Sequence, residues 1–137
     1  MRKNIALTAL LLVFIFSISA VANAAVLSSE YIREARAYTT VDSQGIVNVS
    51  FRIYGTNIMD VLGVKTIIVQ EQAPGSSQWT AVATYSAENN SNMLKYNVVR
   101  MDSSISYSGA KSGYSYRAKV YFYAEKGGYE TLEYIAD

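Results

Sequence analysis

The segment from Gly113 to Gly128 constrains the fold of this chain more than any other, because its side chains alternate in character. One set of alternate positions is apolar or aromatic: Tyr116, Ala118, Val120, Phe122 and Ala124. The positions between them are mostly polar or charged: Ser115, Arg117, Lys119, Tyr121, Tyr123 and Glu125. A strand repeats every two residues, so this pattern predicts one face in a core and the other toward solvent. The glycines at both ends predict turns.

Six further segments have the composition of strands and are separated by turns rich in Gly, Asn and Ser. They are residues 31–41, 47–54, 64–71, 79–85, 94–101 and 129–135. Together they predict one all-β domain, a single antiparallel β-sandwich of about seven strands, with no internal repeat. Residues 102–112 are rich in Ser and Gly and predict a loop, with 105–107 as a short additional strand.

Residues 55–63 carry signals of a single helical turn at one end of the sandwich. Asn57 is a suitable cap, Asp60 follows three residues later, and Gly63 can end the turn in a left-handed conformation. We therefore expect Asp60 to cap or bond the turn. We expect Met59 and Leu62 to face inward and close that end of the core.

The loop of the last hairpin decides which residues of the final strand face the core. A two-residue loop, 127–128, would bury Glu133, whereas a three-residue loop, 126–128, pairs Phe122 with Leu132 and leaves Glu133 outside. Burying an unpaired carboxylate costs several kcal/mol, roughly, so the three-residue loop is favoured. Its last glycine would then supply the left-handed position that such loops need.

This register places aromatic side chains on the outer face of the sheet. Tyr121 and Tyr123 would lie opposite Glu133 and Thr131, with residues of the neighbouring strand beside them. The candidate interaction face is therefore Tyr121, Tyr123, Ile67 and Val69. The competing interpretation is that tyrosine has a high strand propensity and simply forms cross-strand pairs.

Trp79 is the only tryptophan and follows the turn around the only proline. An exposed indole could stack on a sugar ring, which makes Trp79 the candidate sugar-stacking residue. Packing against the core or an edge is the simpler interpretation, because Ala81 and Ala83 share its parity and leave room for a large side chain.

The composition excludes most catalytic chemistry. The chain has no His and no Cys, which removes the usual general base, structural zinc, thiol nucleophiles and Ser-His-Asp triads. The acidic residues are spread thinly and no phosphate-binding loop or calcium loop is present. We expect no enzyme activity, no cofactor and no metal site.

The first 24 residues predict a secretory signal peptide. Arg2 and Lys3 precede a mostly apolar run, and residues 22–24 fit a cleavage site of the form Ala-x-Ala. A membrane anchor is the competing interpretation. Cleavage would leave residues 25–137, or 23–137 from an earlier site, as one secreted domain without membrane insertion. Because the whole chain is +1, losing two cations leaves a near-neutral domain, which does not predict nucleic-acid binding.

The motif Gly113-x-x-Tyr116-x-Ala118-x-Val120 resembles the sixth strand of a fibronectin type III or related immunoglobulin-like domain. The resemblance implies that the hydroxyl of Tyr116, or of Tyr114 as second choice, bonds back to the preceding loop. The second strand of that family often carries a core Trp, where this chain has Phe51 or Ile53.

The chain is also similar to a family of small secreted proteins of Gram-positive bacteria that remain uncharacterised. The similar motifs are Gly55-Thr56-x-x-Met59-Asp60-x-x-Gly63, Trp79-x-x-Val82, Tyr107-Ser-Gly109, the motif around Tyr116, and Tyr123-Ala-Glu-Lys-Gly-Gly128. This resemblance implies a signal peptide followed by one sandwich domain and implies no activity.

These observations favour a secreted, non-enzymatic interaction module whose partner is an unknown protein or glycan. A carbohydrate-binding or adhesive surface protein is the second hypothesis. A structural subunit that assembles through its edge strands is the third.

Overall fold

The structure is a computed structural model that describes residues 29–137, and the described chain is all-β. The predicted signal peptide, residues 1–24, lies outside the described residues. Six strands and one short 3-10 turn follow each other in this order: β1 (Ile32–Val41), β2 (Val47–Gln72), β3 (Thr80–Ser86), η1 (Ser91–Met93), β4 (Leu94–Tyr107), β5 (Ser115–Glu125) and β6 (Tyr129–Ala136).

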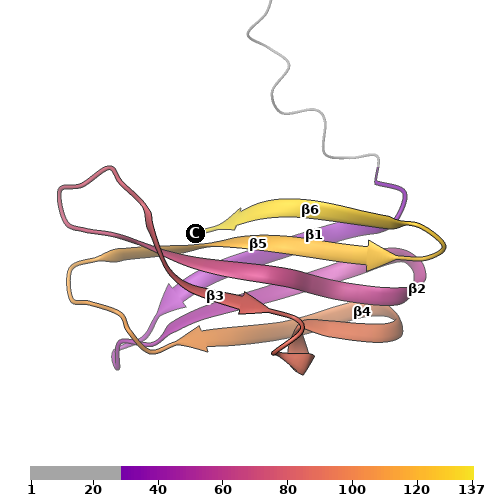
Figure 1. The fold of residues 1–137 in the computed structure, drawn as a ribbon, viewed down its shortest axis with the longest axis horizontal. Coiled ribbons are helices and arrows are strands. Elements are labelled where there is room, and N and C mark those ends of the chain that lie inside the picture. The colour runs from indigo at the N-terminus through magenta and orange to yellow at the C-terminus, as the bar shows by residue number, and fades with distance from the viewer. Residues whose placement is uncertain (1–28) are drawn as a thin grey trace, which may run out of the picture.

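The strands form one antiparallel, curled sheet with β2 at its centre. Residues 47–54 of β2 pair with β1 and with the second half of β4. Residues 59–63 pair with the beginning of β4, and residues 61–72 pair with β5, with β3 on the other side from residue 66 onward. β6 then pairs with β5. Figure 1 shows the reason for the curl. The long strand β2 runs to one end of the molecule, bends there and runs back, so its two halves belong to different parts of the sheet.

The core lies on the inner surface of this curled sheet. Alternate residues of each half of β2 and of β5 are fully or almost fully buried, as period-two alternation requires. Phe51 from the first half of β2 meets Phe122 of β5 edge to face, with 6.4 Å between ring centroids. Phe122 also makes an edge contact with Tyr134 of β6 at 6.1 Å. Aromatic residues from distant strands therefore join the two parts of the sheet.

β1 and β6, the two ends of the pairing path β1–β2–β5–β6, meet at the C-terminal end of β6. The backbone N–H of Thr39 donates to the carbonyl of Asp137 at 3.1 Å, and its hydroxyl donates to the carbonyl of Ala136 at 2.8 Å. This contact satisfies polar groups that an open strand edge would otherwise expose.

The prediction of a helical turn at residues 55–63 was wrong, because the whole segment is extended and belongs to β2. Residues 59–63 pair with the first part of β4: Met59 lies opposite Val98 and Gly63 opposite Leu94. Pairing with a distant strand outweighs the local capping signals. Met59 and Leu62 are nevertheless buried, as predicted.

The predicted loop at residues 102–112 was wrong at 102–104, whereas the extended state predicted for 105–107 is confirmed, as the end of β4 and not as a separate strand. β4 continues without interruption to Tyr107, and Ile105 lies opposite Val49 while Met101 lies opposite Ile53. The serines between them occupy positions with mixed exposure, so a strand poor in apolar residues is held by its pairing with β2.

The predicted register of the last hairpin is confirmed. Phe122 lies opposite Leu132, and the loop between β5 and β6 contains residues 126–128. The left-handed residue is Gly127, with φ of 73°, and not Gly128 as predicted. The carbonyl of Gly128 instead accepts a hydrogen bond of 2.8 Å from the backbone of Lys126.

Candidate functional site

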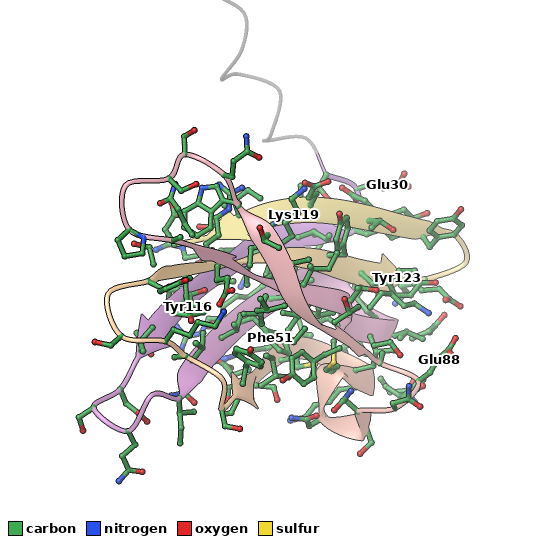
Figure 2. The ribbon with its side chains drawn as sticks, turned by 60° about the vertical axis from the view of Figure 1, so that its left-hand side comes forward. Glu30, Phe51, Glu88, Tyr116, Lys119 and Tyr123 are labelled. Carbon is green, nitrogen blue, oxygen red and sulfur yellow. The ribbon has the colours of Figure 1, made fainter. Side chains whose placement is uncertain are left out.

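The outer surface of β5 and β6 carries the tyrosines that the sequence predicted for an interaction face. Tyr121 lies opposite Glu133 and Tyr123 lies opposite Thr131, so both tyrosines have the predicted cross-strand neighbours. Both rings are half-buried. In Figure 2, Tyr123 and Tyr116 lie at opposite ends of β5, with Tyr123 toward the β5–β6 turn.

Tyr123 is fixed by three neighbours. Its ring stacks on Tyr129 with 5.9 Å between centroids and 24° between planes, and the ammonium of Lys65 lies 4.4 Å from its centroid. Its hydroxyl donates to the carboxylate of Glu125. That hydrogen bond, helped by burial, raises the pKa of Tyr123 to about 12. The ring and the hydroxyl of Tyr123 are thus largely occupied by contacts within the domain.

Ile67 and Val69 do not belong to this outer face, and their predicted place beside the tyrosines was wrong. Both are 0% exposed and lie opposite Val120 and Ala118 on the core side of β5. The reason is a register shift between Val64 and Thr66, which inverts the parity of the second half of β2. The half-buried residue between them, Ile68, faces outward instead.

Two residues that sequence reasoning did not assign complete the outer surface. Tyr129 is 70% exposed at the start of β6, and Ile135 near its end is 39% exposed. Their parity equals that of Thr131 and Glu133, so the confirmed register could have identified them. Ile68 of β2 lies beside these strands, opposite Lys119 of β5. We define the β5–β6 face as Tyr121, Tyr123, Tyr129 and Ile135 together with Ile68.

Trp79 lies just before β3 and is half-buried. The guanidinium of Arg117 lies 4.3 Å from the centroid of the indole ring, and the Nε of Arg117 donates to the side chain of Gln70 at 2.8 Å. No other aromatic ring stacks on Trp79 among the described residues. The guanidinium of Arg117 therefore covers one face of the indole, which is then not available to stack on a sugar.

Tyr116 has the role that the fibronectin-like motif implies. It is buried, and its hydroxyl accepts a hydrogen bond of 2.7 Å from the backbone N–H of Lys111 in the preceding loop. The same hydroxyl donates to Glu71 at 3.1 Å, and the ammonium of Lys111 contacts that carboxylate at 3.0 Å. Burial and the carboxylate raise the pKa of Tyr116 against the opposing effect of the backbone bond.

Asp60 and Met59 are adjacent in β2, but Asp60 faces solvent and Met59 faces the core. Asp60 is exposed in an extended segment, so its predicted role as the cap of a helical turn does not exist. Met59 is 1% exposed and fills the end of the core as predicted. Neither residue contributes to a site on the surface.

A shallow cleft of about 370 Å³ lies between the second half of β2, the end of β3 and the beginning of β4. Its lining is Lys65, Thr66, Ser86, Ala87, Glu88, Leu94 and Tyr96. It contains one cation, Lys65, and one carboxylate, Glu88.

Residues 29–137 contain no group of three metal-ligating side chains. Within the same residues, no helix has the length and apolar character needed to cross a membrane. No family model matches this chain, and no curated protein matches it in sequence.

Proposed function

We propose that this protein is a secreted, non-enzymatic module that binds a protein partner through its β5–β6 face. The exposure of Tyr129 is the observation that carries this proposal. A tyrosine ring that is 70% exposed lies on the same face as the 39% exposed Ile135 and the half-buried Tyr121. Apolar and aromatic side chains gathered among polar ones are typical of protein contact surfaces.

The proposed architecture is a two-layer sandwich with the strand order of a fibronectin type III domain. One layer would contain β1, residues 47–54 of β2 and residues 100–107 of β4. The other would contain β3, residues 64–72 of β2, β5 and β6. Residues 47–54 of β2 pair with β1 and the end of β4, and residues 64–72 pair with β3 and β5, which supports this division. The bond from Tyr116 to the preceding loop supports the family resemblance.

Secretion is part of the proposal and rests on the sequence of residues 1–24. The absence of His and Cys from the sequence supports a non-enzymatic role. Expression of the full chain followed by N-terminal sequencing of the exported product tests the cleavage. A new N-terminus at residue 25, or at 23, agrees with the proposal, whereas a product that keeps Met1 contradicts it.

Site-specific photocrosslinking tests the interaction face. A photoreactive phenylalanine replaces Tyr129 on the β5–β6 face or, as the control, Tyr96 of β4, which is 66% exposed outside this face. We expect a discrete protein adduct from position 129 and not from position 96. With the partner purified, Tyr129→Ser should weaken binding roughly tenfold or more, as for an aromatic anchor. Equal adducts at both positions, or none at 129, would contradict the proposal.

A further inference from the structure

A second surface, on the opposite part of the curled sheet, gathers most of the arginines of the domain. Arg36 of β1, Arg52 of β2 and Arg100 of β4 all point away from the core on neighbouring strands. Arg33, next to the irregularity in β1, joins them. Among the described residues only Arg117 lies elsewhere. A formal charge near zero for the whole chain therefore conceals a local concentration of guanidinium groups.

The register places these groups in adjacent cross-strand rows. Arg36 lies directly opposite Arg52, and Arg52 lies opposite Asp102. In the next row Tyr54 lies opposite Arg100. Neighbouring strands are about 4.8 Å apart, so the rows bring several cations within reach of one extended ligand.

Contacts within the domain hold the arginines in place. The carboxylate of Asp102 accepts from the Nε of Arg52 through one oxygen and from the Nε of Arg100, at 2.6 Å, through the other. The guanidinium of Arg100 also lies 5.3 Å from the Tyr54 ring centroid, and that of Arg33 lies 4.9 Å from it. These contacts leave the terminal Nη groups of Arg52 and Arg100 without a hydrogen bond to the described residues.

The surface keeps an excess of positive charge. Within residues 29–137, only Glu34 and Asp102 form ion pairs with its arginines, and the side chain of Arg36 remains 73% exposed. Like charges directly opposite each other destabilise a sheet, and the Arg36–Arg52 pair is such an arrangement. An anionic ligand would relieve this repulsion.

Hydroxyl and amide groups follow the arginine rows along the same strands. Ser50 lies opposite Ser104, and Asn48 lies opposite Ser106, whose hydroxyl donates to the Asn48 side chain at 2.7 Å. Guanidinium groups match carboxylate and sulfate oxygens, and the neighbouring hydroxyls match the hydroxyls of a sugar. An acidic sugar presents both kinds of group on one residue.

We propose that this arginine face, formed by Arg33, Arg36, Arg52 and Arg100 with the adjacent serines, binds an acidic polysaccharide. We choose a sugar polymer over a nucleic acid because hydroxyl and amide groups follow the arginine rows, and because guanidinium groups already lie over the Tyr54 ring. The site is separate from the β5–β6 face, so it adds a second binding activity to the proposed function. The domain would join a protein partner to an anionic polymer.

Binding of the purified full domain to three polysaccharides at low ionic strength tests the proposal. The probes are heparin, which carries sulfate, polygalacturonate, which carries carboxylate, and dextran, which is neutral. We expect binding to one or both anionic polymers and none to dextran. The double variant Arg36→Gln/Arg52→Gln should lose roughly tenfold or more in affinity, the effect of removing charge-assisted hydrogen bonds.

The matched control is Lys95→Gln/Lys126→Gln, which removes the same charge from positions outside the arginine face. It should bind as the unchanged protein does, and circular dichroism should show that both variants are folded. The proposal is overturned if neither anionic polymer binds, if the arginine variant binds normally, or if the two double variants lose affinity equally. Tighter binding to single-stranded DNA than to either polymer would overturn the choice of a polysaccharide.

Discussion

At the scale of single residues, Tyr116 joins three segments through one hydroxyl group. The hydroxyl accepts a hydrogen bond from the backbone N–H of Lys111 and donates one to the carboxylate of Glu71. The same carboxylate also pairs with the ammonium of Lys111. The loop before β5 is thereby tied to the end of β2. A phenylalanine at this position would fill the same space but leave a backbone donor and one carboxylate bond unsatisfied.

Tyr116→Phe should therefore destabilise the domain by about 1–3 kcal/mol, the usual cost of an unsatisfied buried group. Urea unfolding followed by circular dichroism measures the change. Tyr121→Phe is the matched control, because no hydrogen bond of the Tyr121 hydroxyl occurs among the described residues, and it should change the free energy of unfolding by less than about 0.5 kcal/mol. Equal effects of both variants would show that the Tyr116 bonds contribute nothing.

Asp102 makes the stability of the arginine face dependent on pH. Hydrogen bonds from Arg100 and Arg52 lower its pKa from 3.8 to about 2. Because the folded state holds the proton less tightly than the unfolded state, the carboxylate stabilises the fold above about pH 4. This contribution is lost as the pH falls toward 2.

Asp102→Asn should accordingly lower the urea midpoint at pH 6, and most of the difference from the unchanged protein should be lost by pH 2. The ion pairs are largely exposed, so the difference at pH 6 should be small. If the difference in urea midpoint between the variant and the unchanged protein stays constant from pH 6 to pH 2, Asp102 acts through packing and not through its charge.

At the scale of elements, the course of β2 depends on a close approach at Gly63. This residue has φ of 150° and pairs with Leu94 on one side and Tyr123 on the other. A Cβ atom there would overlap the carbonyl oxygen of Met93 and lie 2.7 Å from the sulfur of Met101. The sequence predicted that Gly63 ends a single helical turn. In the structure, the missing side chain instead allows β2 to lie close to Met93 and to Met101 of β4.

Gly63→Ala should be distinctly more harmful than Gly75→Ala, which also changes a glycine with positive φ, 74°, but one in open space. The left-handed backbone alone costs about 1–2 kcal/mol at Gly75. Overpacking should add about 1–3 kcal/mol at Gly63. Thermal and urea unfolding of the two variants measure the difference, and equal losses would contradict the close approach.

Elements with a strong period-two pattern were predictable, and those decided by distant pairing were not. The β5–β6 register followed from the cost of burying Glu133 against the gain of burying Leu132, both local in the sequence. The extended state of residues 55–63 depends on β4, about forty residues later in the chain. Local capping residues such as Asn57 could not reveal it.

The candidate surfaces also contain residues whose positions the local sequence predicts and residues whose positions depend on distant pairing. The outward positions of Tyr121 and Tyr123 follow from the pattern within one strand, whereas the burial of Ile67 follows from a register shift that no local pattern marks. The arginine face requires knowing that β1, β2 and β4 are neighbours. Each arginine is an ordinary outward residue of its own strand, and net charge averages them with acids elsewhere.

At the scale of the whole molecule, β2 should make unfolding a single cooperative event. It pairs with β1, β3, β4 and β5, so neither part of the curled sheet has a complete set of partners without it. The phenylalanine contact between Phe51 and Phe122 adds a further link across the core. Small domains with one shared core usually unfold in this all-or-none way.

Ile53→Ala tests this cooperativity, because Ile53 is 0% exposed in the first half of β2 and Trp79, the only tryptophan, lies beside β3. The change should cost about 2–5 kcal/mol through the cavity it creates. If the domain is one unit, tryptophan fluorescence and far-ultraviolet circular dichroism should move to the same lower urea midpoint. Ser104→Ala, on the surface of the same part of the sheet, should leave both midpoints nearly unchanged. An unchanged fluorescence midpoint in Ile53→Ala, beside a two-step dichroism curve, would show that the two parts of the sheet unfold separately.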